Sequence, residues 1–401
     1  MTATRNDASG SRAGGEPSPL KVLLVLGTRP EAIKLAPVVL HMKDRPGDFA
    51  VRVCATAQHR QMLDQVLKVF GIVPDVDLDL MRPGQDLFDL TANLISALKP
   101  VLRTEHPDWV LVQGDTTTVW TAALAAFYEG VLVGHVEAGL RTYDKRQPFP
   151  EEVNRRLCTQ LTDLHFAPTR TARQNLLHEG VPADRIVVTG NTVIDALLAV
   201  LQRIGTDPPE DVLKLRQWCD GACGEKPVVL ITGHRRESFG EGFANICQAI
   251  AELSSRHRDV HWVYPVHLNP NVSGPVQSAL SGLANVHLLE PLPYAPFAWL
   301  MQRSALILTD SGGVQEEAPS LGKRVLVMRN TTERPEGVQA GCVKLVGNRR
   351  ESIVEAVEAE LSNRPPGPDP AENPYGDGRS SRRIADAILA FTAKVGQGAG
   401  P

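Results

Sequence analysis

The sequence contains no hydrophobic run that approaches the roughly 20 residues needed to cross a bilayer, which argues against a membrane-spanning protein. The first 20 residues, MTATRNDASGSRAGGEPSPL, are small and polar and have no hydrophobic core of the kind that a secretory signal peptide requires. We therefore expect residues 1–19 to form a disordered tail, and we expect the protein to be cytoplasmic.

An excess of positive charge is also missing. The 42 Lys and Arg residues are balanced by 46 Asp and Glu residues, so the formal net charge is −4. Proteins that bind nucleic acids usually carry a basic excess, and we therefore expect neither a nucleic-acid partner nor another polyanion as a partner.

Cysteine is scarce, with six residues scattered along the chain. That distribution fits a reducing compartment better than a disulfide framework. Cys219 and Cys223 are four residues apart, but no His or Cys nearby in the sequence completes a zinc-binding set. Since a dinucleotide-binding fingerprint is missing too, we expect neither a metal nor a nicotinamide cofactor.

The sequence does contain a regular alternation of short apolar runs and amphipathic stretches. Its length of 401 residues suggests two domains. Continuous apolar strands separated by helices predict a parallel sheet that is covered on both faces. The strands expected in the first half are residues 21–27, 51–56, 108–114, 131–136, 163–169 and 185–190. The alternation then begins again, and the strands expected there are residues 226–233, 260–266, 285–291, 305–310 and 323–328.

This pattern predicts two doubly wound, Rossmann-like α/β domains in series, at residues 20–189 and 190–376. A Pro- and Gly-rich stretch at residues 363–378 precedes a last helix within residues 377–401. In open parallel sheets, ligands bind beyond the carboxyl ends of the strands. The residues that follow each strand are therefore the candidates for a functional site.

The first two candidate positions each allow two interpretations. Arg29 and Lys34 lie in GTRPEAIK, where two cations at a helix N-terminus would bind an anion, although a plain helix start explains the same residues. Asp115 follows the strand at residues 108–114, where it is either a helix N-cap or a functional carboxylate. His135, inside an apolar run, is more typical of a core histidine than of a ligand.

The next strand is followed by a crowd of charges. Glu137 ends an apolar strand, where an unpaired carboxylate is costly to desolvate. It must therefore pair with Arg141 or Arg155, or take part in chemistry. Glu151 and Glu152 in PFPEEVNRR could belong to an ordinary helix start, because acidic residues there complement the helix dipole.

The second half has its own polar strand ends. His234 follows a strand and a glycine, where it could hold a phosphate, move a proton, or be an exposed loop residue. Residues 311–313, Ser-Gly-Gly, would let backbone amides approach a diphosphate at a helix N-terminus. Glu316 and Glu317 could complement the helix dipole or accept hydrogen bonds from ribose, and Arg334 lies in a turn. Two such domains facing each other would enclose a cleft suited to a nucleotide sugar.

At this level of detail the chain resembles the bacterial non-hydrolysing UDP-N-acetylglucosamine 2-epimerases. The resemblance extends from about residue 21 to about residue 390, and its motifs occur in order. The motifs are GTRPEAIKLAPV, TAQHRQMLDQVL, VQGDTTT, GHVEAGLRT, PFPEEVNR, GNTVIDALL, GHRRESFGEGF, YPVHLNPNV, LTDSGGVQEEAPSLG, VLVMRNTTERPEG and NPYGDG.

The resemblance implies a fold similar to that of the GT-B glycosyltransferases, with UDP in the interdomain cleft and held mainly by the second domain. The last helix would pack back onto the first domain, and the protein would be a homodimer without cofactor or essential metal. The implied reaction is reversible epimerisation of UDP-N-acetylglucosamine to UDP-N-acetylmannosamine. Deprotonation at C2 alone gives no stabilised anion, so the family eliminates UDP to form 2-acetamidoglucal and then adds UDP back.

The resemblance also assigns site residues, position by position. The important acid/base and diphosphate residues are Asp115, Glu137, Glu151 and His234. The residues implied to contact substrate or UDP are Arg29, Lys34, Phe297, Ser311, Gly312, Gly313, Glu317 and Arg334. Glu152 is interpreted as structural, and Phe297 either packs against uracil or is a core aromatic.

Many members bind a second UDP-N-acetylglucosamine as an allosteric activator. The matching positions are Gln58, Gln61, Arg235 and His267, with Glu151 at the edge of both sites. Two departures stand out: Gly84 occupies a position where some members carry an arginine, and Gln113 replaces the histidine of the familiar HGDTTT.

A hydrolysing 2-epimerase, a GT-B glycosyltransferase and a UDP-sugar sensor are the alternative functions.

Overall fold

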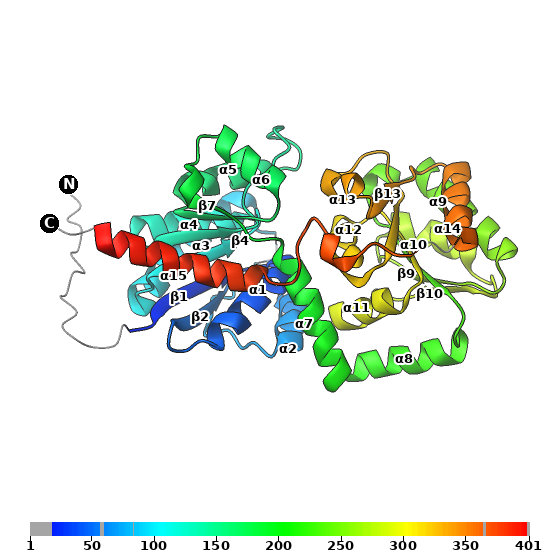
Figure 1. Ribbon diagram of the computed structural model, residues 1–401, viewed down its shortest axis with the longest axis horizontal. Helices are drawn as coiled ribbons and strands as arrows, with labels where there is room; N and C mark the ends of the chain where they lie inside the picture. The colour runs from blue at the N-terminus through cyan, green and yellow to red at the C-terminus, as the bar shows by residue number, and fades with distance from the viewer. Residues whose placement is uncertain (1–17, 57–59, 83, 364–365, 399–401) are drawn as a thin grey trace. The chain divides into compact units, whose positions relative to one another are not determined.

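The computed structural model describes residues 18–56, 60–82, 84–363 and 366–398. The chain divides into two compact units (Figure 1). The first unit runs to Ala196 and includes the residues from Gly378 onward, and the second unit is Leu197–Asp377. The predicted domain boundaries, after residues 189 and 376, lie close to these divisions and stay predictions.

The first unit is built on a seven-stranded parallel sheet with the order β3-β2-β1-β4-β5-β6-β7. The order reverses between β1 and β4, as it does in doubly wound folds. The strands are β1 Leu20–Leu26, β2 Phe49–Ala55, β3 Val76–Asp77, β4 Trp109–Gln113, β5 Leu132–Val136, β6 Leu164–Ala167 and β7 Ile186–Val188. The helices are α1 Arg29–Lys43, α2 Arg60–Phe70, α3 Leu87–Glu105, α4 Thr117–Tyr128, α5 Glu151–Leu161, α6 Arg170–His178, η1 Ala183–Arg185 and α15 Ser380–Gly398. The helix α7 Thr192–Thr206 begins in the first unit and continues into the second.

The second unit repeats the architecture with a six-stranded parallel sheet of order β10-β9-β8-β11-β12-β13. Its strands are β8 Val228–Thr232, β9 His261–Pro265, β10 Val286–Leu289, β11 Leu306–Thr309, β12 Arg324–Val327 and β13 Val343–Leu345. Its helices are α8 Glu210–Ala222, η2 Arg236–Ser238, α9 Glu241–Arg256, α10 Pro270–Leu280, α11 Tyr294–Arg303, α12 Gly312–Glu317, η3 Ala318–Leu321, α13 Pro335–Gln339, α14 Arg350–Asn363 and η4 Pro370–Glu372.

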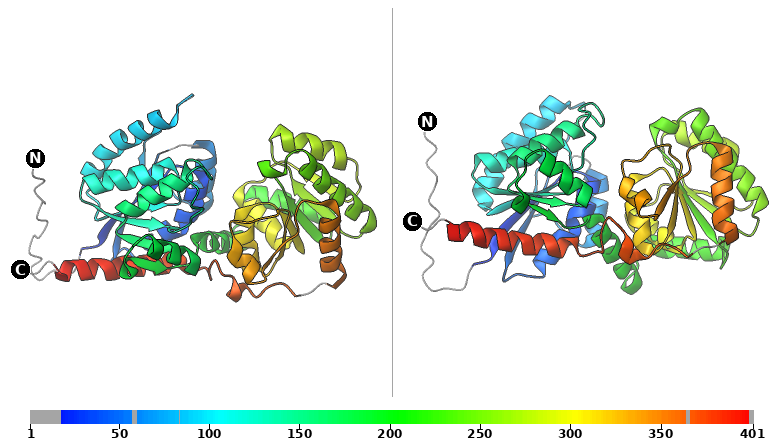
Figure 2. Two further views of the ribbon diagram at one scale, coloured as in Figure 1. Left: turned by 90° about the horizontal axis from the view of Figure 1, so that it is seen from above. Right: turned by 45° about the horizontal axis from the view of Figure 1, so that its top comes forward.

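The apolar runs become buried strands because helices cover both faces of each sheet. In β1, the five residues from Val22 to Leu26 are at most 2% exposed. The helices α3, α4 and α5 pack together, while α1 packs against α2 and α15 (Figures 1 and 2). Fully burying each large aliphatic side chain stabilises the fold by about 1.5–3 kcal/mol. The prediction of two doubly wound α/β units is confirmed, and the predicted cleft stays a prediction.

The last helix belongs to the first unit, although it follows the second in sequence. Trp109 of β4 donates from Nε1 to Thr392 Oγ1 at 2.9 Å and meets Phe391 edge-on, with ring centroids 5.6 Å apart. Asp195 accepts from the amides of Ser380 and Ser381 at 3.2 and 2.7 Å, so it holds the first turn of α15.

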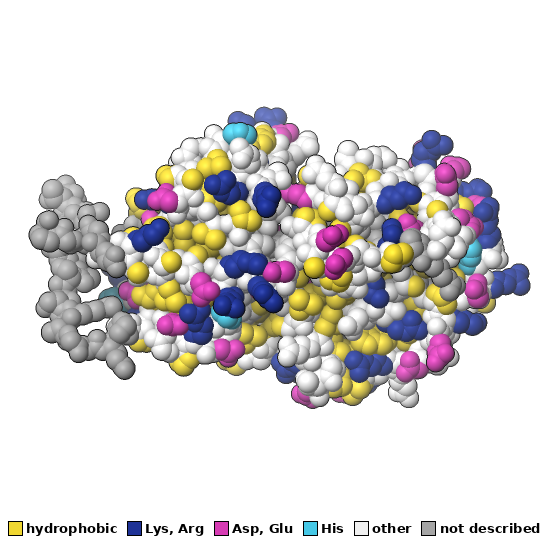
Figure 3. Space-filling model, in the orientation of Figure 1, with side chains coloured by type: hydrophobic (Ala, Val, Ile, Leu, Met, Phe, Trp, Pro, Cys, Tyr) yellow, Lys and Arg dark blue, Asp and Glu magenta, His cyan; other side chains and the backbone are white. Residues whose placement is uncertain are grey.

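Two surface features match the composition. No helix within the described residues is long and apolar enough to cross a membrane. Side chains of both charges are interspersed over the face shown in Figure 3. This mixture agrees with the near balance of acidic and basic residues in the sequence.

Candidate active site

The carboxyl edge of the first sheet brings together polar residues from distant parts of the chain. Glu137, directly after β5, has a side chain only 7% exposed. Its Oε1 lies 2.5 Å from Lys34 Nζ and accepts a hydrogen bond from Asn191 Nδ2 at 3.1 Å, and its Oε2 accepts from Gln113 Nε2. A buried carboxylate with a cation and two amide donors is favoured in its ionised form.

The expected partners of Glu137 were wrong. Arg141 is fully buried and binds Glu179 in bidentate fashion, at 2.8 and 2.7 Å. Arg155 binds Asp115 instead, with Nε at 2.9 Å and Nη2 at 2.7 Å from Oδ2. Sequence proximity suggested Arg141 and Arg155, but the sheet order places the ends of β4, β5 and the first turn of α1 side by side.

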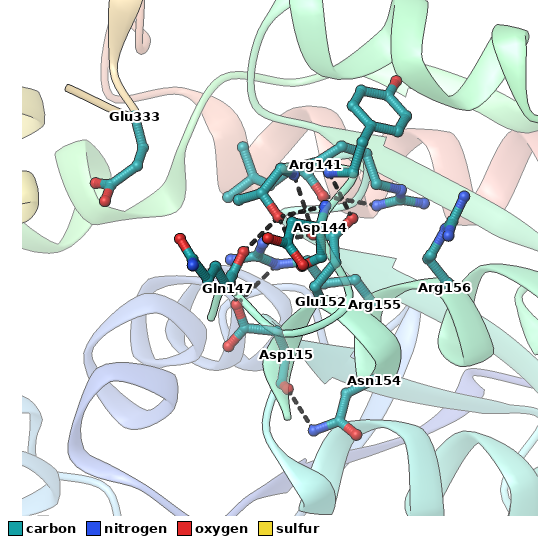
Figure 4. A network of polar contacts seen from close by, with 12 residues as sticks. Asp115, Arg141, Asp144, Gln147, Glu152, Asn154, Arg155, Arg156 and Glu333 are labelled. Atoms are coloured by element: carbon teal, nitrogen blue, oxygen red, sulfur yellow. Dashed lines mark hydrogen bonds and ion pairs between the residues drawn. The ribbon is translucent and has the colours of Figure 1, made fainter. Parts of the chain in front are cut away.

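Asp115 does not cap a helix, so that interpretation was wrong: α4 begins at Thr117, and Thr116 is its N-cap. The Asp115 carboxylate is 26% exposed and is oriented by Arg155, while Asn154 Nδ2 donates to its backbone oxygen at 2.9 Å (Figure 4). Asp115 therefore presents a partly accessible, oriented carboxylate at the end of β4.

The two acids that open α5 have different surroundings. The side chain of Glu152 is fully buried and accepts from the amides of Thr142 and Tyr143, each at 3.1 Å, and from Arg155 at 3.1 Å (Figure 4). Glu151, by contrast, has a buried Oε2 with no hydrogen-bond partner among the described residues. A buried carboxylate oxygen without a donor is costly, and in this respect Glu151 differs from Glu152, whose two oxygens both accept hydrogen bonds.

Glu31 is a buried acid beside the turn after β4 and was not among the predicted site residues. It is 2% exposed and accepts from the amide of Gly27 at 2.6 Å and from the hydroxyls of Thr28 and Thr116 at 3.0 and 2.7 Å. Burial raises the pKa of this carboxyl, and the hydrogen bonds oppose that rise. The spacing of Thr28 and Glu31 is that of a capping box, a signal that could have found it.

His135 is a core histidine, as its place inside an apolar run suggested. It is 1% exposed, and its Nε2 lies 2.7 Å from the carbonyl oxygen of Gly114. Burial lowers the pKa of His135 to about 4, so the imidazole is neutral at physiological pH. It supports the turn that carries Asp115.

In the second unit, Asp310 holds the loop that carries His234. Asp310 follows β11, is fully buried, and accepts from the amides of His234 and Arg235 at 2.7 and 2.8 Å. His234 Nδ1 lies 3.2 Å from Asp310 Oδ1, and the His234 ring stacks on His267 with centroids 5.7 Å apart. Burial would raise the pKa of Asp310, but the His234 side chain and the two amides lower it. Asp310 was not among the predicted site residues.

Two guanidinium groups converge on the start of α12. A Cβ added to Gly312 would lie 3.5 Å from Nη2 of Arg235 and 3.7 Å from Cζ of Arg334. Arg334 Nε donates to Glu316 Oε1, which fixes its orientation. Ser311 is the N-cap and makes no side-chain capping bond, so its hydroxyl is not used within the helix. Glycine keeps the space between the cations open, and the cations suit an anion there.

The remaining predicted contacts lie on neighbouring elements of the second unit. Glu317 is 6% exposed and accepts from the Tyr294 hydroxyl at 2.9 Å. Phe297 is half-buried on α11. A pocket follows the carboxyl ends of β8, β12 and β13, and its lining residues are Ser238, Met328, Arg329, Asn330, Thr331 and Asn348.

The predicted activator positions are only partly described. Gln58 lies outside the described residues, and Gln61 belongs to α2 but its side chain is outside the described part. Arg235 and His267 both lie near His234, through the loop after β8 and the ring stack. Arg29, predicted to contact substrate, is the half-buried first residue of α1.

Several known proteins that resemble this chain belong to one family. Residues 41–389 match the family model described as UDP-N-acetylglucosamine 2-epimerase. The chain is 54% identical over 380 residues to the UDP-N-acetylglucosamine 2-epimerase of Salmonella typhimurium, which covers 94% of this chain and 100% of that protein. It is 55% identical over 377 residues to a probable UDP-N-acetylglucosamine 2-epimerase of Ralstonia solanacearum, with 93% and 100% covered.

Structural comparison agrees with the sequence comparison. The crystal structure of the UDP-GlcNAc 2-epimerase from Neisseria meningitidis bound to UDP-GlcNAc matches with a TM-score of 0.82 and 50% identity. The match covers 92% of this chain and 100% of that one. The two doubly wound sheets, the acids at the strand ends and these relatives lead to one conclusion: the chain belongs to the UDP-N-acetylglucosamine 2-epimerase family.

Proposed function

We propose that this protein interconverts UDP-N-acetylglucosamine and UDP-N-acetylmannosamine by eliminating UDP across C1–C2 and adding it back to enzyme-bound 2-acetamidoglucal. The observation that carries the proposal is the set of acids at the carboxyl edge of the first sheet. Asp115 and Glu137 are held by cations, and Glu151 keeps a buried oxygen without a partner among the described residues. Inversion at C2 requires proton transfer on both faces of the sugar, and several acids can supply it.

The departing UDP needs stabilisation of its diphosphate charge. We propose that Arg235 and Arg334, which converge on Gly312, bind this diphosphate together with the amides that open α12. His234, held by Asp310, donates from its ring to the same group. The Neisseria relative bound to UDP-GlcNAc supports this choice of substrate. The glycal formed on elimination would then stay at the acids of the first unit until UDP returns.

Product analysis tests the proposal against its alternatives. UDP-N-acetylglucosamine is incubated with the purified chain, and sugars are separated by chromatography and identified by NMR. We expect an equilibrium mixture of the two UDP-sugars and almost no free sugar. Free N-acetylmannosamine and UDP as the main products would instead establish a hydrolysing enzyme, and transfer to an added acceptor would establish a glycosyltransferase.

We further propose that the enzyme is a cytoplasmic homodimer. We also propose that a second UDP-N-acetylglucosamine activates it. The activator would contact Gln58, Gln61, Arg235 and His267. Light scattering measures the molecular mass in solution, and a homodimer should have the mass of two chains. Rate curves with UDP-N-acetylmannosamine as substrate should show a lag that a trace of UDP-N-acetylglucosamine removes, and hyperbolic curves without a lag would contradict activation.

A further inference from the structure

A second group of reactive side chains lies at the other edge of the second sheet, away from the loops that follow the strands. Cys219 and Cys223 are four residues apart at the end of α8, a spacing that places side chains on one helix face. Both are buried, at 0% and 3% exposure. They lie just before β8, which begins at Val228.

Two histidines reach these cysteines from neighbouring strands. His261 is the first residue of β9 and pairs with Val228, so it lies at the amino-terminal edge of the sheet. His287 is the second residue of β10, and His261 Nδ1 lies 2.9 Å from His287 Nε2. The ligand atoms of Cys223, His261 and His287 all lie within 4.8 Å of one another, whereas Cys219, one helical turn before Cys223, lies outside this group.

These four side chains have the composition of a structural zinc site. Zinc binds sulfur at about 2.3 Å and nitrogen at about 2.0–2.1 Å in a tetrahedron, which separates two ligand nitrogens by about 3.3 Å. The observed separation of 2.9 Å between the two imidazoles needs only a small adjustment to reach this geometry. Two thiolates and two neutral imidazoles also balance the charge of the ion, which suits a largely buried position.

We propose that Cys219, Cys223, His261 and His287 bind one Zn²⁺ ion. The site lies at the amino-terminal edge of the sheet, whereas His234 and Asp310 follow the carboxyl ends of β8 and β11. The ion is therefore structural. It ties the end of α8 to the first residues of β9 and β10, and this fixes the segment through which the chain enters the second sheet.

Metal analysis of the full-length chain tests the proposal. The chain is produced in zinc-supplemented medium, any affinity tag is removed, and the protein is dialysed against metal-free buffer without chelator. Elemental analysis should find about one zinc per chain, and X-ray absorption at the zinc edge should find sulfur at about 2.3 Å and nitrogen at about 2.0 Å. Cobalt in place of zinc should give the absorption bands of tetrahedral coordination with thiolate charge transfer.

Variants give the matched control. Cys223→Ser and His287→Gln should each lose most of the bound zinc, whereas Cys342→Ser, at a buried cysteine elsewhere in the same unit, should retain it. If a variant folds poorly, the X-ray and cobalt absorption spectra of the wild-type chain still test the proposed zinc site. Folded wild-type protein with less than about one-tenth zinc per chain, a zinc shell without sulfur, or a Cys219–Cys223 disulfide would overturn the proposal.

Discussion

A carboxylate at the end of a buried strand takes its properties from the donors around it, and Glu137 is the clearest case here. Lys34 supplies a positive charge, and Gln113 and Asn191 supply amide hydrogens. Gln113 is the position where the family motif carries histidine, and both residue types can donate to an acid. The departure from the motif therefore keeps a hydrogen-bond donor at this position, and we propose that Gln113 is a positioning residue for Glu137.

Replacing the donor tests this role. Gln113→Leu removes the hydrogen bond to Glu137, and we expect kcat to fall about tenfold to a hundredfold, because a small displacement of a reacting group is costly. Gln113→His should restore most of the rate. Steady-state kinetics and the thermal midpoint are measured together. Equal rates for Gln113→Leu and wild type would show that this contact does not position Glu137.

The paired acids of α5 predict opposite effects. Glu151→Gln should lower kcat by about a hundredfold or more with little change in stability, since acid/base groups contribute about 10²–10⁴-fold. Glu152→Ala should lower the free energy of unfolding by about 2 kcal/mol, because it removes the fully buried carboxylate that accepts from the amides of Thr142 and Tyr143 and leaves Arg155 with Asp115 alone. Urea unfolding and activity assays of both variants measure the two effects. A large loss of stability in Glu151→Gln, or a loss of activity without a loss of stability in Glu152→Ala, would contradict these roles.

His135 predicts a pH dependence of stability. Its pKa is about 4 in the folded protein, against an ordinary value near 6.5, because burial and, to a lesser extent, the charge of Arg141 disfavour the protonated form. Its contribution is fully present above pH 6.5 and is lost as pH falls from 6.5 toward 4. Between pH 7 and pH 5 this amounts to about 2 kcal/mol. His135→Gln should therefore lose less stability over that interval than wild type in urea unfolding, and identical losses would refute the assignment.

Some residues could not be recognised from the sequence by their contacts. Asp310 and Asn191 have the same local appearance as ordinary strand-end polar residues, and the capping box at Glu31 predicts a helix start but not its contact with Thr116. Their importance depends on contacts with residues far along the chain, such as Thr116 for Glu31 and the His234 amide for Asp310. A sequence pattern gives the strand ends but not the pairing of side chains across them.

At the scale of elements, the apolar runs predicted the central strands of both sheets and the edge strands β7 and β10, but they missed the edge strands β3 and β13. The expected strands at residues 285–291 and 323–328 correspond to β10 and β12. The short edge strands β3 and β13 were not predicted, because they have two and three residues and no continuous apolar run. A strand is recognised from the sequence when its apolar run is long enough, and β3 and β13 lack such a run.

The docking of α15 depends on its first turn, which Asp195 holds. Asp195→Ala should lower the free energy of unfolding by about 1–2 kcal/mol, as for the loss of a helix cap, and Asp195→Asn should lose less because it keeps an acceptor. Asp386→Ala is the matched control: its ion pair with Arg45 is half-exposed, and it should cost less than about 1 kcal/mol. Urea unfolding ranks the three variants, and an Asp195→Ala effect no larger than the control's would contradict the role of the cap.

At the scale of the whole molecule, the proposed function assigns different groups to the two doubly wound units. The first carries the acids Asp115, Glu137 and Glu151, and the second carries the cations Arg235 and Arg334 around Gly312. The alternation of strands and helices predicted both units, because each is a parallel sheet with buried strands. How the two units are placed around a substrate is not encoded in that periodicity, and it stays a prediction of the family resemblance.

Hydrogen exchange at C2 tests the central claim most directly. UDP-N-acetylglucosamine is incubated with the enzyme in deuterated water, and both UDP-sugars are analysed by NMR and mass spectrometry. Elimination followed by re-addition predicts that UDP-N-acetylmannosamine carries deuterium at C2, since the returning proton comes from a side chain that exchanges with solvent. UDP-N-acetylmannosamine that retains the original hydrogen at C2 would contradict the account.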